Sequence, residues 1–265
     1  MGRVGAMNDD VENARAGAEA TSRTELLLGA AAMARLREAR ILIAGVGGVG
    51  AAVAEALVRS GCRNLQLADF DAIRASNLNR HPFATMRTLD RPKLEVARER
   101  LMEIAPDLRV ETHSVFIDGT TAGPLLEAAK PEVLVDAIDS LNPKTELLLA
   151  AEKAGIPHVL SCMGAARKLD PMAFRVAALD ETHTCPLARL LRKRLRKRIQ
   201  SNHVLAVFST EPPQELPDEM PEPGPEDFLA GRGRVRSPMG SYAPCTLAAG
   251  TLAAATVIRL VVEGG

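Results

Sequence analysis

Short apolar segments alternate with amphipathic segments over residues 41–161 of this 265-residue chain. Most of the short segments are rich in Ile, Leu and Val, whereas the segments between them repeat their apolar positions every three to four residues, as helices do. The predicted strands are 41–45, 64–69, 109–114, 132–136 and 157–161, and the predicted helices are 49–60, 91–104, 121–129 and 143–154. This alternation predicts an α/β fold in which helices cover both faces of a doubly wound, mostly parallel sheet.

The segments on either side of this alternation predict further elements of the same domain. Residues 24–37 are expected to form a helix before the first strand, and 174–178 and 204–208 are expected to form extra C-terminal strands. The length and composition fit one α/β core with extensions. We therefore expect a flexible tail over residues 1–22 and a single domain over residues 23–265.

The apolar run 243–262 is long enough to raise the question of a membrane span. Ala, Thr and Gly dominate this run, and Arg259 interrupts it, so we expect a helix that packs in the core or in a dimer interface. The N-terminus lacks the apolar core of a signal peptide. The four cysteines lie far apart and form no CxxC pair, as is usual for free thiols in a reducing cytoplasm. A cytoplasmic protein is expected.

Residues 41–50 join a predicted strand to a glycine-rich turn, in the sequence Ile-Leu-Ile-Ala-Gly-Val-Gly-Gly-Val-Gly. A buried strand that turns on glycines into a helix directs several backbone N–H groups and the positive end of the helix dipole at one point, which attracts a phosphate. Asp69 ends the next strand, at the spacing where Rossmann-like folds carry an acidic residue for the ribose hydroxyls. The sequence thus predicts a nucleotide site, although glycine clusters also occur in plain turns. Its glycines are Gly45, Gly47, Gly48 and Gly50.

The residues after Asp69 favour ATP over a nicotinamide cofactor. A second carboxylate, an amide and two cations follow, and they are Asp71, Asn77, Arg80 and Lys93. Attack on a triphosphate needs cations that hold its spreading negative charge, whereas a nicotinamide site has little use for them. Each side chain also has an ordinary structural alternative in a turn or a surface ion pair. Their combination is what predicts an ATP site.

Asp139 lies just beyond the predicted strand 132–136, at the carboxyl edge of the sheet, where open α/β folds bind ligands. A carboxylate on the same edge as a triphosphate is placed to hold Mg²⁺ directly or through water. Its alternative role is to cap the helix that begins near Asn142. We expect Arg80, Lys93 and Asp139 to carry the catalytic chemistry, with Asp139 as the metal residue.

Two segments of opposite charge follow the predicted sheet, although Lys and Arg balance Asp and Glu at 33 each over the whole chain. Residues 187–199 predict an amphipathic helix, since an apolar residue recurs every fourth position and seven cations fall within 189–198. We expect its basic face to bind RNA, a solvated surface being the alternative. The residues expected to contact RNA are Arg189, Arg192, Lys193, Arg196 and Lys197. The segment 211–238 is rich in Pro and acidic residues and is expected to be a mobile loop.

These motifs resemble those of the adenylyltransferases related to ubiquitin-activating enzymes, which include the activators of sulfur-carrier proteins. The shared sequences are Gly-Val-Gly-Gly-Val-Gly at 45–50, Asp-Phe-Asp at 69–71, Ser-Asn-Leu-Asn-Arg at 76–80, Pro92-Lys93 and Asp-Ala-Ile-Asp-Ser at 136–140, and the resemblance covers roughly 24–262. It implies that Asp69 binds the ribose of ATP and that Arg80 and Lys93 bind its phosphates. It also implies that Asp139 lies near the metal and that the protein is a homodimer.

Within this family, the chain is most similar to a branch that dehydrates threonylcarbamoyladenosine in tRNA. The similarity lies in residues 136–144, 168–171, 185–188 and 207–211. The sulfur-carrier activators usually have two CxxC zinc pairs, which this sequence lacks, so ATP and Mg²⁺ but no zinc are expected. The resemblance implies that the carboxylate of the modified adenosine is activated as an acyl-adenylate, and that ring closure then releases AMP. tRNA would be the substrate, and a sulfur-transfer protein is a candidate partner.

Two positions depart from the family's pattern. Glutamine usually follows the arginine that corresponds to Arg80, whereas this chain has His81, which can donate one hydrogen bond and is expected to titrate near neutral pH. Many relatives also donate an N-terminal arginine across the dimer interface to the partner's ATP, but the aligned residue here is Leu26. The cations that could replace it are Arg23, Arg35 and Arg37.

Three other functions account for part of the sequence. An adenylyltransferase that activates the C-terminus of a ubiquitin-like or sulfur-carrier protein would use the same ATP site, but would exchange pyrophosphate only with a carrier that ends in Gly-Gly. An NAD-dependent oxidoreductase is disfavoured because no catalytic Lys, Tyr or His signature accompanies the glycines. A non-catalytic nucleotide-binding scaffold would be favoured if the phosphate-site cations were lost, but Arg80 and Lys93 are present.

Overall fold

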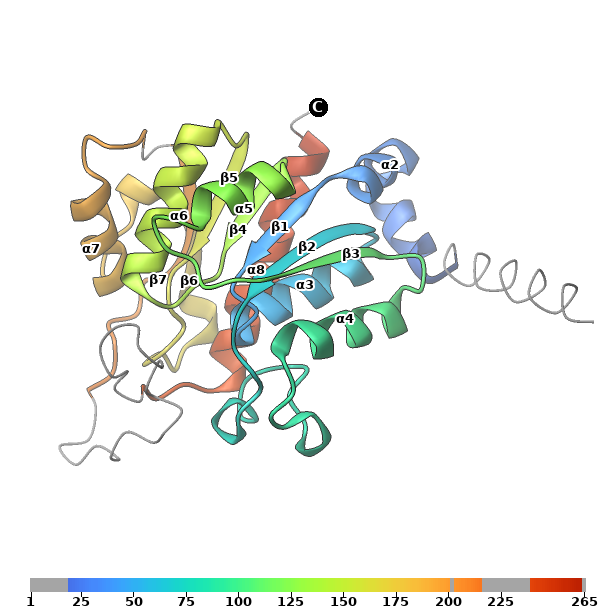
Figure 1. The fold of residues 1–265 in the computed structure, drawn as a ribbon, viewed down its shortest axis with the longest axis horizontal. Coiled ribbons are helices and arrows are strands. Elements are labelled where there is room, and N and C mark those ends of the chain that lie inside the picture. Colours follow the sequence, from blue (N-terminus) through green and yellow to red (C-terminus); the bar gives the residue numbers. More distant parts are fainter. Residues whose placement is uncertain (1–18, 201–202, 216–238, 264–265) are drawn as a thin grey trace, which may run out of the picture.

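The computed structural model describes residues 19–200, 203–215 and 239–263, and within them seven strands form one sheet in the order β3-β2-β1-β4-β5-β7-β6 (Figure 1). The strands are β1 (Ile41–Ala44), β2 (Asn64–Asp69), β3 (Arg109–Ser114), β4 (Val133–Asp136), β5 (His158–Cys162), β6 (Phe174–Ala178) and β7 (Val204–Ser209). Neighbouring strands are parallel, except that β6 runs antiparallel to β7. The strand order reverses between β1 and β4, which creates the switch point where such sheets bind ligands.

Helices cover both faces of the sheet, as the sequence predicts. On one face lie α2 (Ala30–Glu38), α3 (Gly48–Arg59), α4 (Lys93–Ile104) and α8 (Ala243–Glu263), and on the other lie α5 (Ala122–Ala129), α6 (Leu141–Ala154) and α7 (Pro186–Leu195). Alternate residues of β1 enter the two cores, with Ile41 and Ile43 in one and Leu42 and Ala44 in the other. Short 3₁₀ turns are η1 (Ala75–Asn77), η2 (Met86–Thr88), η3 (Pro171–Ala173) and η4 (Leu179–Glu181).

The predicted strands and helices of the alternating region agree with the structure to within two residues at each boundary. The prediction of one helix over 24–37 is wrong in one respect, because the structure has two helices in this region. They are a helical segment over 19–28 and α2. Gly29 separates the two with a φ of 84°, in the left-handed region that glycine adopts readily. The last part of the predicted tail is therefore helical, and its first eighteen residues lie outside the described part of the chain.

The basic helix ends earlier than its apolar spacing predicts, at Leu195 instead of residue 199. Arg196 leaves the helical conformation, Lys197 has a φ of 62°, and the N–H groups of Arg198 and Ile199 both donate to the carbonyl of Leu195. This turn brings the Ile199 side chain back to the apolar cluster beneath α7. Ile199 thus contributes to the same apolar face without being helical.

The apolar helix α8 packs against α3 and the sheet, as expected for a core helix. By length and composition it could cross a membrane, but 44% of its most apolar window is buried inside the protein. The approach of α8 to α3 is close because Gly250 lies opposite Ala52. A Cβ added at Gly250 would lie 2.6 Å from the Ala52 Cβ and 2.8 Å from the carbonyl oxygen of Val49.

Gly250→Ala is therefore expected to lower the free energy of unfolding by about 1–3 kcal/mol, since backbone and methyl groups cannot yield as a flexible side chain would. Urea unfolding measures the change. The matched control is Gly123→Ala in the first turn of α5, where an added Cβ has no neighbour within 4 Å. That control should be neutral or stabilising by up to about 1 kcal/mol. An unchanged midpoint for Gly250→Ala would contradict the close packing.

Candidate functional site

The glycine turn after β1 is shaped by two close backbone approaches. Gly45 has a φ of +91°, and a Cβ there would lie 2.9 Å from the carbonyl oxygen of Ala137, next to the end of β4. A Cβ on Gly50 would overlap the carbonyl oxygen of Gly45. Both positions therefore require glycine, which confirms the predicted strand-turn-helix. The turn brings β1, the start of α3 and the loop after β4 together at the switch point.

One part of this turn is open, whereas the rest is packed. A Cβ on Gly48 would lie 2.6 Å from the Thr246 side chain and 3.0 Å from the Arg80 carbonyl oxygen, but one on Gly47 would meet nothing within 4 Å. Gly47 is the N-cap of α3. The first N–H groups of an α-helix have no partner within the helix, so this open end offers donors to an anion.

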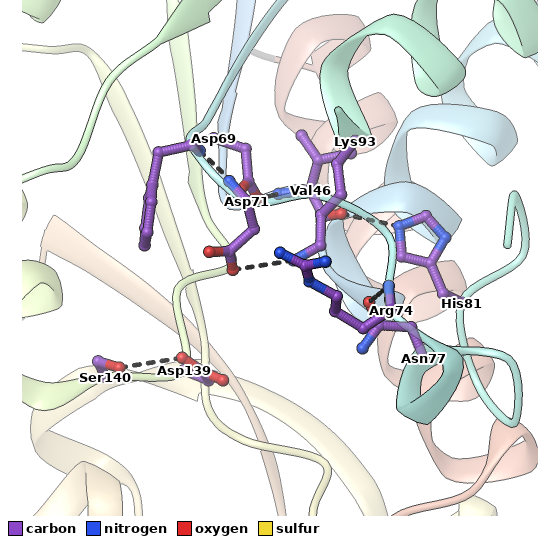
Figure 2. Close-up of polar contacts among 10 residues, drawn as sticks. Val46, Asp69, Asp71, Arg74, Asn77, His81, Lys93, Asp139 and Ser140 are labelled. Carbon is purple, nitrogen blue, oxygen red and sulfur yellow. Dashed lines mark hydrogen bonds and ion pairs between the residues drawn. The ribbon is translucent and has the colours of Figure 1, made fainter. Parts of the chain in front are cut away.

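Asp69 is tied to the glycine turn by its carboxylate (Figure 2). One oxygen accepts the Val46 N–H at 2.6 Å, and the other accepts the N–H groups of Phe70 at 2.7 Å and Asp71 at 2.8 Å. The residue is 8% exposed. A carboxylate has about four lone-pair positions, so these three bonds leave about one for a ligand. Asp69 therefore stabilises the turn itself, which is the structural alternative that the sequence left open beside its predicted role in the site.

Lys93 forms an ion pair with Asp71 across a distance of 3.0 Å between Nζ and Oδ2. The Lys93 side chain is 10% exposed, and its backbone N–H donates to the Asp71 carbonyl oxygen. These contacts fix the first residue of α4 beside the end of β2. The sequence predicted both residues for the site, and the structure shows that Asp71 holds Lys93.

Arg80 lies against Gly48, in the segment between β2 and α4. Its guanidinium donates to the Ser76 carbonyl oxygen at 2.6 Å and to the Asn79 side chain at 3.0 Å. Burial lowers the pKa of Arg80, and the carboxylate of Asp139 counteracts that effect. Arg80 and Asp139, predicted to share one site, therefore interact electrostatically.

Two other predicted residues differ in how they enter this arrangement. Asn77 caps the turn η1, since its side-chain oxygen accepts the Arg74 N–H at 3.1 Å, so its described contact is local. Asp139 is exposed on the loop between β4 and α6, and its carboxylate accepts the Ser140 hydroxyl at 3.0 Å. Within the described residues, no three His, Cys, Asp or Glu side chains gather as a metal cage would require.

His81 is a buried part of the site. Its Nε2 lies 2.9 Å from the Val46 carbonyl oxygen, and its Nδ1 accepts the Phe83 N–H at 3.2 Å. The second bond needs an unprotonated Nδ1, so the ring is neutral with its proton on Nε2. Burial lowers the pKa of His81 to about 4, and the nearby cations Lys93 and Arg80 lower it too. The prediction that His81 titrates near neutral pH is thus wrong, whereas the predicted donor role is confirmed.

Asp136, Lys144 and Ser161 form a buried polar cluster beneath the site, and the sequence predicted no role for them. The Lys144 Nζ lies 2.7 Å from an Asp136 carboxylate oxygen, and both side chains are 0% exposed. The available signal was an aspartate at the end of the apolar strand Val-Leu-Val-Asp, followed eight residues later by a lysine in the next helix. Because burial depends on the tertiary fold, this signal was ambiguous.

The cations predicted to bind RNA differ in their surroundings. Arg192 is half-buried and donates to the backbone carbonyl of Thr182 at 2.6 Å, so it supports the packing of α7. The other four, all exposed, are Arg189, Lys193, Arg196 and Lys197. Most of the acidic segment that was predicted to be a mobile loop, 216–238, lies outside the described residues. Its start is anchored, because the Glu211 carboxylate accepts the N–H groups of Leu169 and Asp170.

The N-terminal cations considered for a role across a dimer interface also differ. Arg35 donates to the Val262 carbonyl oxygen at 2.7 Å, and Arg37 lies 3.4 Å from an Asp107 carboxylate oxygen. Arg23 is exposed on the first helical segment, close to Leu26. Among the described contacts, those of Arg35 and Arg37 lie within the subunit, and none involves the Arg23 side chain. Arg23 is therefore the candidate of the three for a contact with a partner.

Comparison with known proteins gives one family over nearly the whole chain, since the model of the ThiF family matches residues 21–264. The tRNA threonylcarbamoyladenosine dehydratase of Bacillus subtilis is 32% identical over 224 residues, which are 84% of this chain and 87% of that protein. The tRNA threonylcarbamoyladenosine dehydratase 2 of Saccharomyces cerevisiae is 37% identical over 77% of this chain. This chain spans about half of that yeast protein, namely 47% of its length.

Comparison with solved structures gives a similar result. The crystal structure of the E. coli tRNA N6-threonylcarbamoyladenosine dehydratase in complex with ATP matches with a TM-score of 0.79. The match covers 93% of this chain and 95% of that one, at 27% sequence identity. The comparison thus extends over both halves of the sheet and confirms the predicted Rossmann-like fold class.

The buried neutral His81 predicts a pH dependence of stability. Its pKa is about 4 in the folded protein and about 6.5 in an unfolded chain, so its contribution is fully present above pH 6.5. That contribution is lost as the pH falls toward 4, because the unfolded state then binds the proton more tightly. Between pH 7 and 5, urea unfolding should show a loss about 1–2 kcal/mol larger for the unsubstituted protein than for His81→Gln. Equal losses in the two proteins would contradict the buried neutral ring.

Proposed function

The chain belongs to the ThiF family, and we propose that it is an ATP-dependent tRNA threonylcarbamoyladenosine dehydratase. In this reaction it adenylates the carboxylate of the modified adenosine and promotes closure of a ring. The observation that carries the proposal is the match to the E. coli dehydratase in complex with ATP over almost the full length of both chains. The cations and the glycine turn described above lie at the carboxyl edge of the sheet, at the switch point between β1 and β4 where such sheets bind ligands.

The first step joins the substrate carboxylate to the α-phosphate of ATP. A carboxylate oxygen attacks the α-phosphorus, the bond to the β-phosphate breaks, and pyrophosphate leaves. The resulting mixed anhydride is a far better electrophile than the carboxylate. Arg80 and Lys93 are the cations that would hold the charge on the α-phosphate and on the leaving pyrophosphate. The amides at the open end of α3, beside Gly47, would bind phosphate oxygens.

The second step needs positioning more than a protein nucleophile. A nucleophile within the same modification attacks the activated carbon and loses its proton, the ring closes, and AMP leaves with the former carboxylate oxygen. An intramolecular reaction of this kind has a high effective concentration once it is bound in place. The buried thiols suit this mechanism, because burial raises the pKa of Cys62 to about 11 and that of Cys162 to about 12, and neither is a ready nucleophile.

Mg²⁺ fits the donor set as a partner of the triphosphate. Asp139 offers a hard carboxylate beside Arg80, and Mg²⁺ in nucleotide sites is usually held by one or two carboxylates together with phosphate oxygens. Asp139 is thus the residue that would hold it. Bound there, the ion would neutralise charge on the phosphates.

A homodimer is part of the proposal. Leu26 and Leu27 are 88% and 81% exposed on the first helical segment, and adjacent apolar side chains this exposed favour a protein contact. Arg23 lies on the same segment and would then be close to the partner. The cytoplasmic location and the sulfur-transfer partner stay predictions.

The decisive experiment incubates the protein with ATP, Mg²⁺ and modified tRNA, and looks by mass spectrometry for a nucleoside that has lost one water. Arg80→Ala and Asp139→Ala should each lower this turnover about 100-fold or more, because each removes a charge from the phosphate site. The matched control is Arg74→Ala, which removes a nearby exposed arginine paired with Asp90 and should retain turnover within about twofold. No dehydrated nucleoside, or pyrophosphate exchange only with a carrier ending in Gly-Gly, would overturn the proposal.

The exposed cations of α7 and of the turn after it are proposed to bind the phosphates of tRNA. Changing the four residues Arg189, Lys193, Arg196 and Lys197 to Gln should weaken tRNA binding and reduce the slope of log K against log salt by about three to four. Arg192 is retained because it supports packing. The control changes four exposed arginines on the other side of the fold to Gln, namely Arg59, Arg98, Arg100 and Arg109. Equal salt slopes in the α7 variant and the original protein would exclude this surface, and ATP affinity should stay unchanged.

A further inference from the structure

The ion pair between Asp136 and Lys144 is completely buried and fully hydrogen-bonded. The Lys144 ammonium donates to the Asp136 carboxylate at 2.7 Å, to the Ser161 hydroxyl at 3.1 Å and to the Cys162 carbonyl at 2.9 Å. The Ser161 hydroxyl donates to the same Asp136 oxygen at 2.7 Å. These contacts join the ends of β4 and β5 to the first turn of α6.

This cluster also shapes the loop that carries Asp139. The second carboxylate oxygen of Asp136 accepts the N–H of Ile138 at 3.2 Å, which fixes the turn between β4 and α6. At the other end of this loop, the Lys144 N–H donates to the Ser140 carbonyl oxygen and starts the helix. Asp139 thus lies between the turn that the Asp136 side chain fixes and the start of the helix that carries Lys144.

The same turn forms one wall of the glycine turn. The Ala137 N–H donates to the Ala44 carbonyl oxygen at 2.8 Å, and the Ala137 carbonyl oxygen faces Gly45. A displacement of residues 136–138 would therefore move the phosphate-binding turn and Asp139 together. A buried ion pair is a weak source of stability, because desolvation of both charges offsets most of their attraction, and apolar residues would fill the space as well. Fixed geometry is what the pair can supply.

We propose that Asp136 and Lys144 are positioning residues, which hold Asp139 and the glycine turn in register for one nucleotide. The inference rests on the proposed function for its substrate, but it concerns ATP binding, which is measurable without tRNA. Neither residue contacts the nucleotide in this mechanism. Both act through the loop from 137 to 140.

The test is a mutant cycle with Asp139, read as the dissociation constant of ATP in the presence of Mg²⁺ by calorimetry. Single substitutions would leave one charge buried and endanger the fold, so the pair is removed together as Asp136→Leu with Lys144→Met. The Leu side chain offers no acceptor for the Ile138 N–H, so the turn loses the side-chain contact that fixes it. We expect ATP affinity to fall about tenfold or more, as is usual when residues that orient a ligand-binding group are replaced. In an Asp139→Asn background, the same pair of substitutions should lower affinity by a clearly smaller factor, since the part of the effect that acts through Asp139 is already gone and only the part that acts through the glycine turn is left.

The matched control removes another buried cation at the opposite edge of the sheet. Arg63 immediately precedes β2, is 5% exposed and lies 2.8 Å from the Asp107 carboxylate. Among the described contacts of Arg63, none is with the loop from 137 to 140, so Arg63→Met tests loss of stability alone. It should leave ATP affinity within about twofold when urea unfolding shows that the protein is folded. Unchanged ATP affinity in the variant that lacks the ion pair would overturn the inference. So would a loss of affinity by the same factor in the Asp139→Asn background as in the original protein. Failure of the original protein to dehydrate tRNA would instead overturn the proposed function. The ATP dissociation constants of the mutant cycle could still be compared in that case.

Discussion

The approach of Gly50 to the carbonyl oxygen of Gly45 is the constraint on which the site depends. It lets β1 turn directly into α3, so that the first amides of α3 face outward beside Gly47. The same turn is closed by the Asp69 carboxylate through the Val46 N–H and by His81 through the Val46 carbonyl. Two later segments, at Asp69 and at His81, are thereby fixed around one short piece of backbone, and the open end of the helix is formed before any ligand arrives.

Charges at this edge are held by neighbours of opposite sign. Lys93 is paired with Asp71, and the charge of Arg80 is opposed by Asp139. Such pairing lowers the cost of keeping cations half-buried in the absence of a triphosphate. It also fixes their positions, which is useful for a reaction whose barrier is lowered mainly by charge already in place. The neutral His81 adds a hydrogen bond without adding another positive charge to this crowded region.

The site shows where prediction from the sequence succeeded. The glycine spacing, Asp69 at the end of β2, and Asp139 beyond β4 were sufficient to predict that these residues meet at the switch point, because parallel strands bring their carboxyl ends to the same edge. The partners of these residues could not be predicted in the same way. Three contacts between distant segments decide these partners. The Asp69 carboxylate accepts hydrogen bonds mainly from the turn, Asp71 holds Lys93, and Arg192 supports the packing of α7.

The sequence by itself determined the order of strands and helices, the glycine turn and the family, since these depend on local periodicity and on short motifs. The tertiary structure alone decided protonation and burial. His81 has a low pKa because segments from both sides exclude water from it, and Lys144 is a buried ion-pair partner because β4, β5 and α6 converge on it. The end of α7 at Leu195 was decided in the same way, because an apolar side chain can reach its core either along a helix or from the turn that follows.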